Sequence, residues 1–249
     1  MNNMKIKLLL LPILAFALQA CNIDKTVKNN DNYVNRNISV NDFTDICIES
    51  SDVYFTQGAQ TSVKITGNEE DIKQIKIYNK DNTLHIEKVS KNLSLMSLLR
   101  NPRNKINVFV TSPNLRGVHI MGSGNLCAEK GIDTDRMKIK ITGSGYVEMK
   151  SIICDLSSID IMGSGSINID NITTAQSNMR IMGSGSINIS KSAIKNVAGN
   201  ISGSGSIELD NANIGYAKSE INGSGSIDIQ GRVKKHDDKV NGQGSINIR

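Results

Sequence analysis

The residues of this chain whose type and spacing could serve chemistry are serines that recur at a fixed interval between two glycines. Gly-Ser-Gly begins at Gly122, Gly143, Gly163, Gly183, Gly203 and Gly223, and a variant Gly-Gln-Gly begins at Gly242. The intervals are 21, 20, 20, 20, 20 and 19 residues. A fixed period of this length is typical of repeat proteins, so these hydroxyls predict an extended polar surface rather than an enclosed active site.

The sequence around each repeat predicts a β-strand. In Ile181–Ile189 the isoleucines and glycines occupy one parity, while Met182, the serines and Asn188 occupy the other. The same alternation is found in Ile161–Ile169, Ile201–Leu209 and Ile221–Ile229. Strict alternation favours a strand with one buried face, and helical spacings are missing. The glycines suit a bend in which the backbone takes positive φ.

A period of twenty residues also restricts how the strands connect. At roughly 3.3 Å per residue, one period traces about 65 Å, enough for one turn of two or three short strands but too little for a crossover helix. Successive turns would then pair in parallel, about 4.8 Å apart. We therefore expect an all-β fold, a right-handed parallel β-helix (β-solenoid) with about 20 residues per turn.

Stacked turns would align the outward residues in columns. The first column holds the central serines, the second runs from Asn125 to Ser245, and the third runs from Cys127 to Asn247. A further column holds Met121, Met162 and Met182, which predicts contact with a partner or cover by another part of the chain. The candidate binding surface consists of Ser164, Ser184, Ser204, Ser224, Met162 and Met182.

Two interpretations of the serine columns remain open. The hydroxyls could bond between turns and keep the protein soluble, or they could form a flat surface that recognises a glycan or a surface protein. Sugar-binding faces usually carry aromatic platforms, whereas this chain has no Trp and the columns contain only Tyr146. This composition weakens the glycan interpretation.

Catalytic and metal-binding patterns are missing from the sequence. His85, His119 and His236 are far apart, without paired-ligand spacing. We expect no catalytic residues, no metal, no cofactor and no enzymatic activity, with a polysaccharide-active enzyme as the least favoured alternative. Cys47, Cys127 and Cys154 cannot all pair with one another, so no disulfide is predicted; Cys154 fits a small buried group, and Cys47 could face either way.

The N-terminus predicts export and a lipid anchor. Lys5 and Lys7 precede an apolar run, and Leu18-Gln19-Ala20-Cys21 resembles a bacterial lipobox, in which the cysteine is lipidated. The alternative is an ordinary cleaved signal. We expect a signal peptide over 1–20, membrane attachment through Cys21 and a polar tether over 21–37. Removal of the signal lowers the net charge from +5 to +3, too weakly basic to indicate a nucleic-acid partner.

The remaining residues, 38–249, predict one solenoid domain. Residues 38–118 are β-rich without the glycine period and would form the opening turns and cap, while 119–249 would form seven Gly-Ser-Gly turns. Residues 90–105 carry an isolated apolar cluster that would pack over the end of the solenoid or contact a partner or the membrane surface. The charged last turn, with Asp238 at a core parity, predicts an edge that discourages stacking.

Three segments together give a family resemblance. They are Asp42–Ile46 with Asp52–Gly58, then Val108–Leu115, and the repeated Gly-Ser-Gly. This ordered combination resembles the head GIN domain family of auto-transporter adhesins, secreted or lipidated bacterial proteins, many from Bacteroidota. The resemblance covers about residues 39–249 and implies a right-handed β-solenoid and an adhesive or binding role. An envelope scaffold without a dedicated ligand is the alternative, and no catalytic residues carry over.

The resemblance also bears on location. Surface-exported lipoproteins of Bacteroidota tend to carry an acidic run after the lipidated cysteine, whereas here Asn22-Ile23-Asp24-Lys25 follows. We therefore expect a lipid-anchored protein of the outer membrane, on the periplasmic face in preference to the cell surface.

Overall fold

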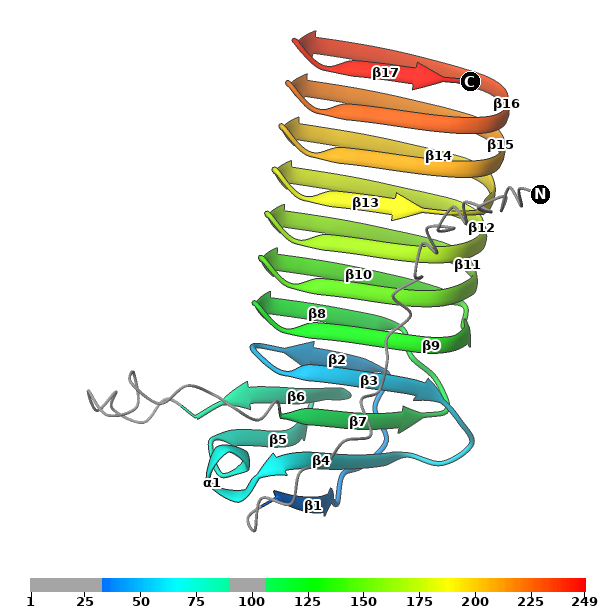
Figure 1. Cartoon of the computed structure of the whole chain (residues 1–249). Helices are drawn as coiled ribbons and strands as arrows, with labels where there is room; N and C mark the ends of the chain where they lie inside the picture. Colours follow the sequence, from blue (N-terminus) through cyan, green and yellow to red (C-terminus); the bar gives the residue numbers. More distant parts are fainter. Residues whose placement is uncertain (1–32, 90–105) are drawn as a thin grey trace, which may run out of the picture. The chain divides into compact units, whose positions relative to one another are not determined.

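The computed structural model describes residues 33–89 and 106–249. These residues belong to one compact unit, Asn32–Arg249, which is almost entirely β-structure (Figure 1). The predicted signal peptide, Cys21, most of the tether and the apolar cluster at 90–105 lie outside the described residues. In the part of the chain that is described, no helix is long and apolar enough to cross a membrane.

The glycine-repeat region forms a β-solenoid of about 7 turns with roughly 20 residues per turn, as the period predicts. Consecutive turns pair in parallel and in register, so that Ile187 lies beside Ile167 and Ile207. The strands are β8 (Gly117–Gly122), β9 (Asn125–Asp133), β10 (Arg136–Gly143), β11 (Tyr146–Gly163), β12 (Ser166–Gly183), β13 (Ser186–Ile189), β14 (Ser192–Gly203), β15 (Ser206–Gly223), β16 (Ser226–Gly242) and β17 (Ser245–Ile248).

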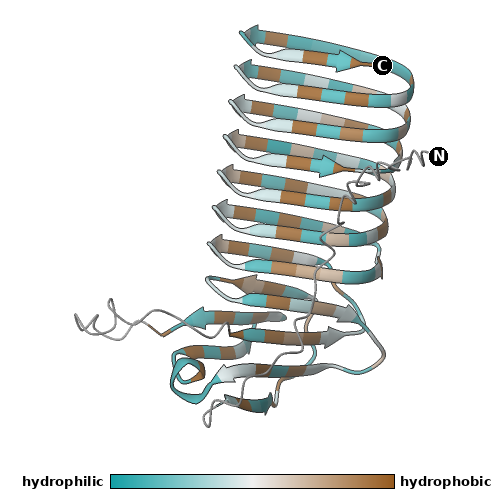
Figure 2. Ribbon diagram, in the orientation of Figure 1, coloured by the Kyte–Doolittle hydropathy of each residue, from teal (hydrophilic) through white to brown (hydrophobic). Residues whose placement is uncertain are grey.

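The core follows the predicted parity. Ile161, Ile167 and Ile187 are all 0% exposed, and the inward residues of every full turn join one continuous hydrophobic cluster. Figure 2 shows the resulting alternation of apolar and polar residues along each strand. Burial of one row of side chains per strand removes apolar area from water along the whole length of the solenoid, which is what holds the turns together.

The N-terminal region continues the solenoid and then closes it. Strands β2 (Asp45–Ile48) and β3 (Asp52–Gln57) pair in parallel with β8 and β9. Strands β6 (Thr83–Lys88) and β7 (Asn107–Ser112) pair in parallel with β2 and β3 respectively. Beyond them β4 (Ser62–Asn68) pairs antiparallel with β7, and β5 (Ile75–Lys80) forms an antiparallel hairpin with β6. The cap therefore contains antiparallel pairs, unlike the parallel glycine turns.

A short helix, α1 (Glu69–Ile72), follows β4 and was not expected from the sequence. The Asn68 side chain caps it by accepting a hydrogen bond from the Glu70 N–H, and Ile72 is 3% exposed. The Gly67-Asn68 pair ends β4 immediately before this helix. Ile72 thereby contributes to the apolar cover at the cap end of the core.

The predicted tether ends earlier than residue 37, because Tyr33–Ile38 forms strand β1, antiparallel to β4. Val34 and Ile38 pack against the core, and the Tyr33 hydroxyl donates a hydrogen bond to Thr66. The polar residues between them face solvent, as expected for an edge strand. Two apolar residues in a stretch rich in Asn and Arg gave too weak a pattern for sequence analysis to detect this strand.

The last turn is polar where the preceding turns are apolar. In β16, His236 is in register with the buried Ala217, and Asp238 is in register with the buried Ser219. The His236 imidazole and the Asp238 carboxylate contact each other and are partly exposed. Charged groups at core parity make this edge unsuitable for pairing with a further apolar turn, which agrees with the sequence expectation.

Candidate functional site

The Gly-Ser-Gly segments form sharp bends along one edge of the solenoid, at the arrowheads on the left of Figure 1. The first glycine of each has positive φ, for example +130° at Gly163 and +131° at Gly183. A Cβ at Gly183 would lie 2.4 Å from the carbonyl oxygen of Gly163 in the preceding turn. Glycine is required here because the backbone bends into the left-handed region where the turns touch.

The central serines hold the edge together through their main chain. The N–H of Ser164 donates to the Gly143 carbonyl at 3.0 Å, and the next turns repeat this bond. The side chains of Ser164, Ser184, Ser204 and Ser224 are exposed, as predicted. Within residues 33–89 and 106–249 their hydroxyls have no hydrogen-bond partner, so the expected bonding between turns does not apply to this column.

The second and third columns do bond between turns. The hydroxyls of Ser166 and Ser186 are 2.8 Å apart, and the Asn188 amide donates to the Asn168 side chain at 2.9 Å. Asn168 in turn donates to the Tyr146 hydroxyl at 2.9 Å. These side chains satisfy one another, which leaves fewer groups for a ligand.

The methionine column lies directly beside the bends. Met121, Met162 and Met182 are 43%, 42% and 48% exposed, and Met162 is in register with Met182. Of the two alternatives for this column, cover by another part of the chain is not found among the described residues. The glycine-bend edge therefore presents unpartnered hydroxyls next to flexible apolar groups, which can bind a ligand but offer no catalytic group.

Sequence analysis missed an aromatic pair in the cap. The third column continues from Cys127 to Tyr54 on β3 and Phe109 on β7, and the two rings stack at 5.3 Å. Phe109 is 37% exposed, but Tyr54 covers one ring face and the Lys64 ammonium lies 4.9 Å over the ring. The Phe109 ring is thus covered by Tyr54 and by Lys64, and one face of Tyr54 is covered by Phe109, which leaves little ring surface for stacking on a sugar.

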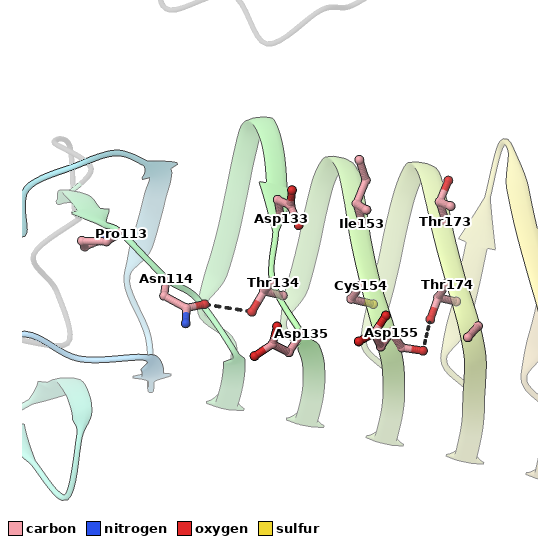
Figure 3. Close-up of a pocket in the computed structure, with 11 residues that line it drawn as sticks. Pro113, Asn114, Asp133, Thr134, Asp135, Ile153, Cys154, Asp155, Thr173 and Thr174 are labelled. Atoms are coloured by element: carbon pink, nitrogen blue, oxygen red, sulfur yellow. Dashed lines mark hydrogen bonds between the residues drawn. The ribbon is translucent and has the colours of Figure 1, made fainter.

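A hollow of about 600 Å³ at the opposite bend, also missed from the sequence, gathers carboxylates from two turns (Figure 3). Asp135 and Asp155 lie in adjacent turns, joined by the hydrogen bond from the Asp155 N–H to the Asp135 carbonyl at 3.0 Å. The Asp135 side chain is 80% exposed and contacts Arg116 at 3.5 Å. Such an open site lacks the desolvation that would tune a carboxyl group for acid catalysis.

The described histidines and cysteines include one cluster that the sequence did not reveal. Register brings His85, Cys47 and His119 together on three neighbouring strands, although they are far apart in the sequence. Across the described residues, no group of three or more His, Cys, Asp or Glu side chains is arranged to hold a metal ion. Cys47 and Cys154 are buried, Cys127 is partly exposed, and none forms a disulfide. Burial raises the pKa of the Cys47 and Cys154 thiols.

The family is decided by a model described as "Putative auto-transporter adhesin, head GIN domain", which matches residues 42–232. The chain belongs to this family. The match covers the cap and nearly all of the glycine turns of the head GIN domain described above. The search of curated proteins found no significant match.

Solved structures agree with this assignment. A "putative adhesin" from Bacteroides fragilis is 26% identical, with a TM-score of 0.79 over 88% of this chain and 98% of that one. A "putative lipid binding protein" from Parabacteroides distasonis is 23% identical, with a TM-score of 0.75 over 88% of this chain and 98% of that one. A "putative adhesin" from Parabacteroides merdae is 18% identical, with a TM-score of 0.74 over 88% of this chain and 97% of that one. The last two support the head GIN fold alone.

Proposed function

We propose that this head GIN domain protein is a non-catalytic binding module of the cell envelope, acting as an adhesin through its glycine-bend edge. One observation carries the proposal: the unpartnered hydroxyls of Ser164, Ser184, Ser204 and Ser224 lie beside Met162 and Met182, whose side chains are exposed in adjacent turns. Contiguous exposed apolar groups mark interaction surfaces, and Met162 and Met182 lie side by side in adjacent turns. Family membership and the relative from Bacteroides fragilis support the same role.

The regularity of this edge also suits a repetitive ligand. Register places equivalent residues of consecutive turns beside each other, about 4.8 Å apart. A glycan chain or a repetitive surface protein could therefore contact several turns with equivalent groups, and several weak contacts would combine into useful avidity.

A glycan-array screen of the chain from residue 22 onward tests the proposal. A reproducible hit that is lost on substitution in the serine or methionine column supports a binding module. No hit on glycans or on surface-protein preparations favours the alternative, an envelope scaffold, for which the mutually bonded Ser166–Ser186 and Asn168–Asn188 ladders are the supporting observation. Turnover of a polysaccharide that a single Asp or Glu substitution abolishes would contradict the non-catalytic assignment.

The proposed location is the outer membrane, with the chain held by a lipid on Cys21. The lipobox-like sequence and the polar residues that follow it support this placement. A Cys21→Ala variant should leave the membrane fraction, whereas a control variant that keeps Cys21 and carries only Cys47→Ala should remain in it.

Protease added to intact cells distinguishes placement on the periplasmic face, which we favour, from placement on the cell surface. Digestion of the domain with periplasmic controls intact would show surface placement.

A further inference from the structure

Strand β10, next to the methionine column, carries a row of cations on its outer face. Arg136, Lys138 and Lys140 alternate with the buried Met137, Ile139 and Ile141. Alternate residues of a strand are about 6.7 Å apart, so the three positive charges form a short line. Elsewhere on the surface, Lys150 pairs with Asp170 at 2.6 Å and Arg116 pairs with Asp135 at 3.5 Å. Within the described residues the three cations of β10 form no ion pair.

Two hollows flank this row and share Lys138. One has a volume of about 350 Å³ and reaches from Lys138 and Lys140 past His119 to Thr83 and Asp45. The other, of about 320 Å³, reaches from Arg136 and Lys138 to Ser158, Gln176 and Asn178. Gly117 is in register with Lys138, and the Asp45 carboxylate lies where a Gly117 side chain would be. Each hollow thus combines cations with hydroxyl or amide groups.

Among the described residues, the nearest carboxylates form no ion pair with the row. Asp160 is in register with Lys140 and accepts a hydrogen bond from Ser158 at 2.9 Å. Asp45 is in register with Gly117, one strand from Lys138, and accepts a hydrogen bond from Thr44 at 2.7 Å. Burial lowers the pKa of His119, and the charges of Lys140 and Lys138 lower it further. The imidazole therefore senses a positive potential that a bound anion would reduce.

We propose that the outer face of β10 binds an anionic polysaccharide, with its acidic groups along Arg136, Lys138 and Lys140 and its sugar hydroxyls in the two hollows. This inference rests on the proposed adhesive function and names its ligand class. Lines of Lys and Arg recognise sulfated or carboxylated glycans electrostatically. No aromatic ring face is needed for this mode, which agrees with the covered rings of Tyr54 and Phe109. Thr142, the next outward residue of β10, joins the row to the methionine column.

Dextran sulfate and neutral dextran of equal length are the probes for this site, with the chain from residue 22 onward immobilised. We expect dextran sulfate to bind with an affinity that falls as salt rises, and dextran not to bind. A Lys138→Gln/Lys140→Gln variant should bind roughly tenfold more weakly. The matched control is Lys195→Gln/Lys218→Gln, in which Lys218 occupies the same column as Lys138 four turns further on. This control should bind within about twofold of the unmodified chain.

A spectroscopic readout separates this site from adsorption elsewhere. The chain has three histidines, so the His119 ring can be followed by NMR. Dextran sulfate should raise the pKa of His119, because an anion beside Lys138 and Lys140 offsets their charge. The shift should disappear in the Lys138→Gln/Lys140→Gln variant and persist in the control.

Several results would overturn the inference. They are equal binding of both dextrans, equal weakening in both lysine variants, an unchanged His119 pKa at saturation, or binding of duplex DNA as tight as that of dextran sulfate. If the array gives a neutral glycan that depends on Met162 and Met182 while dextran sulfate does not bind, the adhesin proposal stands and the anionic site is wrong. If β10-dependent binding of dextran sulfate occurs but no envelope or host surface is bound, the site stands and the adhesin role is wrong.

Discussion

The main-chain N–H of Ser184 donates a hydrogen bond to the carbonyl oxygen of Gly163, one turn earlier, at 3.0 Å. The same carbonyl oxygen lies 2.4 Å from the point where a Cβ of Gly183 would be. The bend therefore exists only because glycine has no side chain, and it leaves the serine hydroxyl pointing outward. The repeated tripeptide couples the stacking of the solenoid to its exposed polar edge.

Alanine at two neighbouring glycines should have opposite effects. Gly203 has φ +131° and its Cβ would lie 2.3 Å from the Gly183 carbonyl, so Gly203→Ala should destabilise the fold by about 2 kcal/mol or more. A Cβ at Gly199 would make ordinary van der Waals contacts with Ile227 and Ile207 methyl groups at 3.4 and 3.5 Å, so Gly199→Ala should stabilise the fold by about 0.5–1 kcal/mol. Urea unfolding measures both. Equal destabilisation would contradict the backbone conformations.

Substitutions at an inward and at an outward residue of the same repeat should differ sharply in their effect on stability. Ile187 is 0% exposed between Ile167 and Ile207, so Ile187→Asp buries a charge without a partner and should cost at least about 4 kcal/mol. Ser184→Ala removes an exposed hydroxyl and should change stability by less than about 0.5 kcal/mol. Thermal unfolding followed by circular dichroism checks the pair. Equal tolerance at both positions would refute the assigned parity.

The three described cysteines should react at different rates. Burial raises the pKa of Cys47 and of Cys154, so at pH 8 less of each thiol is ionised than in a free cysteine, and alkylation should be slow. Cys127 is more exposed and should be alkylated first. Mass spectrometry of iodoacetamide-treated native protein gives the order, and treatment in urea should make all three equally reactive. Faster reaction at Cys47 than at Cys127 would contradict the burial.

The glycine turns could be predicted from sequence because their information is local. Apolar and polar residues alternate in the same way in each turn, so the burial of Ile187 and the exposure of Ser184 follow from this alternation alone. The cap could not be predicted in this way, since the pairing of β1 depends on a register between Tyr33 and Asn68, which are remote in sequence. A long-range register leaves no periodic signal in either strand.

Of the candidate binding surfaces, one could be predicted from the sequence and the other could not. The columns of Ser164 and Met162 follow from the period, whereas the β10 row required the structure. Arg136, Lys138 and Lys140 alternate visibly in the sequence, but the two hollows beside them depend on residues from β2, β6 and β8 on one side and β11 and β12 on the other. Ion pairing likewise depends on side-chain geometry that sequence spacing does not fix.

The central claim is that the glycine-bend edge binds a ligand, and its most direct test is the affinity for the best glycan-array hit. Isothermal titration should compare the unmodified chain with Met162→Thr/Met182→Thr, which installs the residue that Thr142 already provides in this column. The control is Ile153→Thr, which removes an apolar group of similar exposure from the middle of β11. We predict a loss of roughly tenfold or more for the methionine variant and less than about twofold for the control. Equal affinities for all three proteins would contradict the claim.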